Sequence, residues 1–191
     1  PEEWPLPSVE VAKECLGTQY WMDPFPEELK PIGAIFPDMG CDRHCDFCQT
    51  PTYGTGYRRM TPKRVMEWLD VLCEAGAKSV VSLSDQFLGR TIFPGGREEI
   101  LEIMKGVRER NLAVLWPNGL EMRKMTMGRG HSGKKEDLTP DEEVIQAIYN
   151  WDGRKGTLAG YLPAERPIFG RESYAKLVPW QQHKRIVRTI V

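Results

Sequence analysis

The sequence predicts an α/β fold of parallel strands and helices that forms part of a (βα) barrel. Short apolar runs, each fit for a buried strand, alternate with segments whose apolar residues recur every three or four positions. This alternation implies right-handed crossovers between parallel strands. It occurs four times in 191 residues, whereas an eightfold barrel typically needs about 250 residues. We therefore expect a truncated barrel, its N-terminal half, over residues 31–191.

Four apolar runs are the expected strands. The first lies between two prolines, Pro31 and Pro37, which bound it sharply. The expected strands cover residues 32–36, 79–83, 112–116 and 156–162.

Helix-start and helix-stop signals mark the segments after the strands. Thr61 is a capping residue followed by a proline at the first helical position, and Gly76 ends the same segment. Thr139 and Pro140 repeat the starting pattern. The expected helices cover residues 61–76, 98–107, 139–148 and 180–191.

Residues 1–30 differ in character from the rest of the chain. They contain five prolines and no sustained apolar period. We expect an irregular linker that follows an upstream domain.

The overall composition excludes several classes of protein. The net charge of −1 argues against a polyanion-binding protein, so we expect no nucleic-acid partner. Hydrophobic residues make up 40% and charged residues 28%, as in a globular chain. No apolar run approaches the roughly 20 residues of a membrane-spanning helix, and no signal peptide opens the sequence. We expect a cytoplasmic protein without a membrane partner.

Three cysteines directly follow the first expected strand. Cys41, Cys45 and Cys48 have the spacing Cys-x3-Cys-x2-Cys, which lets three thiolates converge on one metal centre. Barrel enzymes place their chemistry at this end of the strands. Three cysteines on a four-iron cluster leave one iron open to bind another molecule. The alternative is a structural zinc site of the Cys3His type that includes His44.

The stretch GCDRHCDFCQT resembles the signature of the radical S-adenosylmethionine (SAM) superfamily, including the aromatic Phe47 before the third cysteine. The resemblance implies a 4Fe-4S cluster on Cys41, Cys45 and Cys48 whose open iron chelates SAM. It also implies that Phe47 lies against the cluster and the adenine. In that superfamily, SAM yields a 5′-deoxyadenosyl radical or serves as a methyl donor.

Two further stretches, residues 57–62 (YRRMTP) and SVVSLSDQF, are similar to the cobalamin-dependent subgroup of this superfamily. The sequence SVVSLSDQF contains Asp85, followed shortly by Phe87, and Asp85 stands where many relatives have a Gly-Gly-Glu stretch that contacts the SAM amino group. Glu165 matches the glutamate of a Glu-Ser pair, with Arg166 in place of the serine. The resemblance implies that Asp85 and Glu165 lie near the polar groups of SAM.

The segment TLAGYLPAERPIFGRESYAKLVPWQQH also resembles cobalamin-dependent tryptophan 2-methyltransferases. It implies methyl transfer to an unactivated carbon of a small-molecule substrate, with an indole carbon as the candidate. Tyr161 is a candidate catalytic residue. Radical chemistry would also require an external electron donor. No Asp-x-His-x-x-Gly cobalamin motif occurs in these residues, so the resemblance implies a cobalamin-binding domain upstream of Pro1, with residues 1–30 as the linker that follows it. A hydrogen-abstracting enzyme without cobalamin remains an alternative.

The remaining cysteines and one basic stretch are given no role in the site. Cys15 lies in the expected linker and Cys73 on the first expected helix, and neither can complete the cluster by local geometry. The basic segment 123–135 is interpreted as a solvated loop, with an active-site cover as the alternative.

Overall fold

The centre of the structure is a parallel sheet of three strands. In this computed structural model the strands β1 (Ile32–Ile35), β4 (Ser79–Ser82) and β5 (Ala113–Leu115) pair in the order β1-β4-β5. The structure describes residues 1–17, 29–43, 48–50, 54, 56–116, 120–126 and 140–149. Within these ranges the α/β fold with parallel strands is confirmed. They contain no closed barrel, and the strand expected at 156–162 and the helix expected at 180–191 lie outside them.

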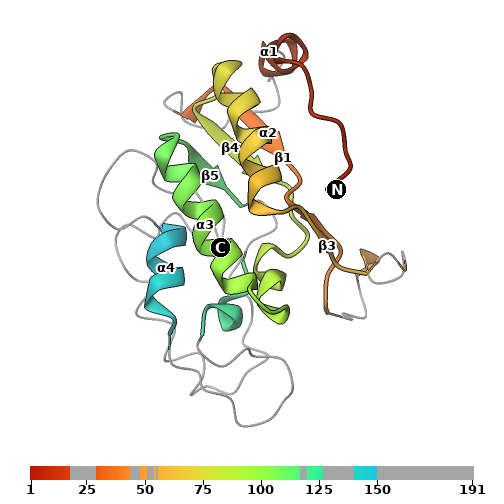
Figure 1. Cartoon of the computed structure of the whole chain (residues 1–191), viewed down its shortest axis with the longest axis vertical. Coiled ribbons are helices and arrows are strands. Elements are labelled where there is room, and N and C mark those ends of the chain that lie inside the picture. The colour runs from red at the N-terminus through yellow and green to blue at the C-terminus, as the bar shows by residue number, and fades with distance from the viewer. Residues whose placement is uncertain are drawn as a thin grey trace.

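Three helices lie in a row over one face of the sheet (Figure 1). They are α2 (Pro62–Glu74), α3 (Gly96–Glu109) and α4 (Glu142–Tyr149), and each packs against the next. The 3-10 helix η4 (Phe87–Ile92) joins β4 to α3, and η5 (Met122–Met125) follows β5. Because each helix after a strand returns to the start of the next parallel strand, the loops after the strands collect at one edge.

The capping signals for α2 are confirmed. The hydroxyl of Thr61 accepts a hydrogen bond from the backbone N–H of Arg64 at 3.2 Å. Gly76 has a φ of +100°, the left-handed conformation that follows many helix ends. Sequence signals of this local kind therefore located both ends of α2.

The start of α4 differs from the expectation based on Thr139 and Pro140. Pro140 pairs with Thr126 in an antiparallel bridge and is therefore extended rather than helical. Asp141 caps the helix, because its carboxylate accepts from the N–H of Val144 at 3.2 Å. The helix begins at Glu142 as a result.

The N-terminal segment is not wholly irregular, contrary to the expectation for residues 1–30. Val9–Gly17 forms helix α1, which buries Ala12 and Leu16 and packs against α2 and β1. The hydroxyl of Ser8 accepts from the N–H of Val11 at 3.3 Å and starts this helix. A helix of only nine residues, with prolines on either side, is too short to show a sustained apolar period in the sequence.

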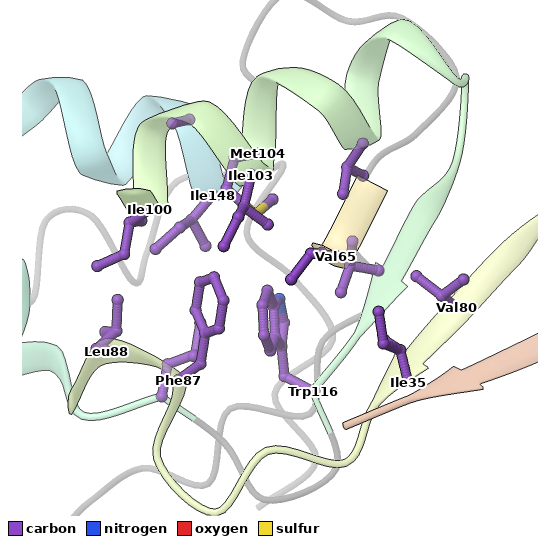
Figure 2. Packing of buried hydrophobic residues seen from close by; sticks show 14 of the residues in the cluster. Ile35, Val65, Val80, Phe87, Leu88, Ile100, Ile103, Met104, Trp116 and Ile148 are labelled. Atoms are coloured by element: carbon purple, nitrogen blue, oxygen red, sulfur yellow. The ribbon is translucent and has the colours of Figure 1, made fainter. Parts of the chain in front are cut away.

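The main core lies between the sheet and the row of helices. Figure 2 shows Phe87 and Trp116 at its centre, below the residues of α3. The two rings are tilted by 41° with centroids 4.8 Å apart. Ile35 and Val80 reach this core from the strands, and Val65 reaches it from α2. The core fixes η4, and with it the loops at the carboxyl edge of the sheet.

The opposite face of the sheet is also apolar. Ala34, Val81 and Leu115 lie opposite one another across the three strands, and Val81 and Leu115 are buried. Burial of both faces explains why the strands are nearly continuous apolar runs rather than alternating ones. Among the helices that the structure describes, none is both long and apolar enough to pass through a bilayer.

Candidate functional site

The cysteines lie on an excursion of the chain that we call the cysteine loop, residues 40–57. It leaves the carboxyl end of β1 and is closed at its base by a two-stranded antiparallel ribbon. The ribbon consists of β2 (Asp38–Met39) and β3 (Arg58–Arg59). The loop therefore begins and ends at the edge of the sheet where α/β proteins bind their ligands.

Two glycines let the two sides of the loop meet at its base. Gly40 has a φ of +85°, and a Cβ built on it would lie 2.1 Å from the carbonyl oxygen of Gly56. A side chain at position 40 is excluded both by this contact and by the positive φ. The residue before Cys41 is thus held at one backbone conformation.

Two of the three candidate cysteine ligands are described, Cys41 and Cys48; both are partly exposed, and neither forms a disulfide. The backbone N–H of Arg43 donates to the Sγ of Cys41 at 3.4 Å. Such N–H donors commonly tune cluster thiolates, so this donor set fits iron–sulfur ligation. Cys45, together with His44 and Phe47, lies outside the described residues.

No group of three or more metal-ligating side chains is found within the described ranges, from which Cys45 is missing. The other two cysteines lie on helices. Cys15 is exposed on α1, and Cys73 packs against the core from α2. Burial raises the pKa of the Cys73 thiol, as expected for an unreactive cysteine. Tyr161, Glu165 and Arg166 lie outside the described residues.

Asp85 joins the end of β4 to the start of the cysteine loop. Its carboxylate accepts a hydrogen bond from the N–H of Gly40 at 2.7 Å, and its side chain is otherwise exposed. The carboxylate thus supports the backbone that precedes Cys41.

A buried acid lies beneath the base of the loop. Asp38 is fully buried and accepts a hydrogen bond from the hydroxyl of Ser84. Burial raises the pKa of this carboxyl to about 6, and the hydrogen bond and the nearby Arg90 oppose the rise. The second oxygen of Asp38 has no hydrogen-bond partner among the described atoms.

Arg90 ties the ribbon to the helices. Its fully buried guanidinium donates to the carbonyl of Met60 at 2.8 Å and to that of Pro37 at 2.7 Å. It also pairs with Glu99 of α3 at 2.9 Å. Each of these carbonyls flanks a ribbon strand, so Arg90 fixes the orientation of the loop base.

Four charged side chains connect the first part of the cysteine loop to η5. Arg43 makes two hydrogen bonds to the carboxylate of Glu121. The ammonium of Lys124 pairs with Asp42 and, at 3.1 Å, with Glu121. We call this set the four-charge network: Asp42, Arg43, Glu121 and Lys124.

The network is largely shielded from solvent. The side chains of Lys124 and Glu121 are 0% and 3% exposed. Burial lowers the pKa of Lys124 from its ordinary value, and Asp42 opposes this effect. The amide of Gln86, at the end of β4, donates to Glu121 at 3.2 Å. Charges from the loop, η5 and the end of β4 thus meet in one place.

Sequence reasoning missed Glu121, Gln86 and Lys124. The interpretation of 123–135 as a solvated loop is wrong at Lys124, which is fully buried. The usable signal was two opposite charges three residues apart, Glu121 and Lys124, among the apolar Leu120 and Met125.

No protein-family model matches this chain, and no curated protein or solved structure matches it either.

Proposed function

We propose that this chain is the core of a radical SAM enzyme, with a 4Fe-4S cluster on Cys41, Cys45 and Cys48. The observation that carries the proposal is the cysteine spacing in a loop at the carboxyl end of β1. Three thiolates at this spacing suit a cluster with one open iron. The carboxyl edge of parallel strands is where such folds hold their cofactors.

The strand order supports a partial barrel. The strands β1, β4 and β5 are adjacent in chain order, and the helices pack on the same face. Continued addition of strand–helix units in this sense would close a barrel, with Ala34, Val81 and Leu115 on its inner face.

The residues of this chain hold and orient the cofactors in the proposal. Gly40 and Asp85 hold the backbone before Cys41, and the Arg43 N–H donates to its sulfur. The cluster would supply an electron to SAM, or the open iron would bind SAM as a methyl source. Asp85, Glu165 and Phe47 are the proposed SAM-contacting residues, by resemblance.

Cobalamin-assisted methyl transfer to an unactivated carbon is the finer part of the proposal. It rests on the resemblance of the segment from Thr157 to His183, with an indole carbon of a small molecule as the candidate acceptor. Tyr161 is the candidate catalytic residue because it alternates with Leu162 on the strand expected at 156–162 and would face the barrel interior beside Glu165. Cobalamin would be bound by a separate domain. An external electron donor is required if the cluster is reduced.

The test is anaerobic reconstitution followed by counting of iron and sulfide. The parent should bind about four irons and four sulfides per chain, and the Cys41→Ala, Cys45→Ala, Cys48→Ala variant should bind almost none. A Cys15→Ala, Cys73→Ala variant is the matched control and should bind as much as the parent. Equal iron in the parent and the triple variant would reject the proposal.

The same experiment tests the zinc alternative. A structural zinc site predicts one zinc per chain, a colourless protein and no affinity for SAM. Metal analysis of protein purified without oxygen separates the two outcomes.

A further inference from the structure

We propose that the four-charge network is a positioning device that folds the cysteine loop into its ligating conformation before the metal centre is bound. The side chains of the network are not proposed as ligands. They act through the backbone between the first two cysteines. Only the identity of the centre rests on the function proposed above.

The position of the network in the chain supports this role. Asp42 and Arg43 fill two of the three positions between Cys41 and Cys45. Arg43 is bound to Glu121, the residue before η5, and Asp42 is bound to Lys124 within η5, so the loop is attached at consecutive residues directly after its first ligand. Two consecutive attachments fix the direction of the backbone as well as its position.

The 3-10 turn at the start of η5 places the side chains of Glu121 and Lys124 next to each other. Residues three apart lie on the same face of a 3-10 turn. The N–H of Lys124 donates to the carbonyl of Glu121 at 3.0 Å and closes this turn. The carboxylate of Glu121 therefore accepts hydrogen bonds from Arg43, while the ammonium of Lys124 pairs with the carboxylate of Asp42. The four neighbouring charges thus alternate in sign.

Because the network is buried, it is better explained as selecting one conformation of the cysteine loop than as adding to the free energy of unfolding. Removing charged groups from water costs much of what their attraction returns, and apolar residues of similar volume often stabilise a fold equally well. A buried network is favourable only when every member is paired. All four side chains are paired only when the loop lies against η5 in this arrangement. Any other arrangement would leave a buried charge without its partner, which costs free energy.

Lys124 has a second effect, on the metal centre itself. Its ammonium pairs with Asp42, the residue directly after Cys41. A cation beside a cluster thiolate stabilises the reduced, more negative form of the cluster. Lys124 should therefore raise the midpoint potential of the bound cluster.

The chain offers a matched pair of arginines for the test. Arg43 makes two hydrogen bonds to buried Glu121, and its side chain is 30% exposed. Arg97 makes two hydrogen bonds to buried Asp141 and a third to exposed Glu143 at 2.7 Å, and its side chain is 34% exposed. Arg43→Met and Arg97→Met each remove a two-bond pair with a buried carboxylate, and Arg97→Met also removes the pair with Glu143, but only Arg43 lies in the cysteine loop.

The first measurement is amide hydrogen exchange of the metal-free, full-length protein. Peptides that cover residues 40–50 should exchange faster in Arg43→Met and in Lys124→Met than in the parent. In Arg97→Met these peptides should match the parent, and faster exchange should appear at α3 and α4. Arg43→Lys keeps the charge but loses the paired geometry, so it should show a smaller increase and guards against a variant that fails to fold.

The second measurement uses the iron-loaded protein. Loss of iron to a chelator should be about 10- to 100-fold faster in Arg43→Met, as for other residues that orient metal ligands. The midpoint potential should fall in Lys124→Met and stay at the parent value in Arg97→Met.

Two results would overturn the proposal. Unchanged exchange of residues 40–50 in both Arg43→Met and Lys124→Met rejects the positioning role. An unchanged potential in Lys124→Met rejects the electrostatic effect. A parent that binds no iron would reject the proposed function alone, because the exchange comparison needs no metal.

Discussion

Asp38 illustrates how a single residue at the base of the cysteine loop carries an electrostatic cost. Its carboxyl is fully buried, and burial outweighs the hydrogen bond from Ser84 and the attraction of Arg90, so the pKa rises from 3.8 to about 6. Between these two values the folded protein binds more protons than the unfolded chain. The free energy of unfolding contributed by Asp38 is therefore greatest below the lower value and is lost as the pH rises through about 6.

We predict that Asp38→Asn removes this part of the pH dependence. A pKa rise from 3.8 to about 6 corresponds to roughly 3 kcal/mol between the two pH limits. Relative to the parent, the variant should gain about this much stability between about pH 4 and pH 7. Urea unfolding of both proteins across this range measures the difference. Parallel stability curves for parent and variant would contradict it.

Single residues also show what the sequence could and could not reveal about the site. The cysteine spacing is local and is visible within eight positions. The partners of Arg43 and Asp42 lie 78 and 82 residues away, so only the fold brings them together. Asp85 was singled out as a residue near SAM, and the structure adds its hydrogen bond to Gly40.

At the scale of elements, the ribbon of β2 and β3 sets the position of the cysteine loop relative to the sheet. Only two residue pairs form it, so its position depends on Arg90 below it and on the close approach of Gly40 to Gly56. A substitution at Gly40 should therefore disturb the cysteine loop more than the hydrophobic core.

We predict that Gly40→Ala disrupts the loop far more than Gly54→Ala. Both glycines have positive φ, +85° and +63°, so each alanine carries a backbone strain of about 1–2 kcal/mol. Only at position 40 would the new Cβ also meet backbone, whereas position 54 has open space. Gly40→Ala should lower both the melting temperature and the iron content, and Gly54→Ala mainly the melting temperature. Equal iron content in the two variants would count against the account.

Element types were easier to predict than element limits. The capping signals at Thr61 and Gly76 are local, and they located α2 correctly. The bridge between Thr126 and Pro140 is a tertiary contact, and it delays the start of α4. Helix α1 is stabilised by packing on α2 and β1, which no period over nine residues reveals.

At the scale of the whole molecule, the sheet brings the separate parts of the site to one edge. The cysteine loop follows β1, Asp85 and Gln86 follow β4, and η5 follows β5. The alternation of strands and helices was sufficient to predict this parallel arrangement, because parallel pairing requires a crossover after each strand. The closure of a barrel depends on contacts beyond these strands, and it stays a prediction.

The measurement that tests the central claim most directly is electron paramagnetic resonance of the anaerobically reconstituted, reduced protein with and without SAM. A cluster with one open iron predicts a signal from a reduced 4Fe-4S centre that changes shape when SAM is added. The Cys41→Ala, Cys45→Ala, Cys48→Ala variant should show no such signal. A parent protein that gives no cluster signal, or a signal that SAM leaves unchanged, would contradict the account.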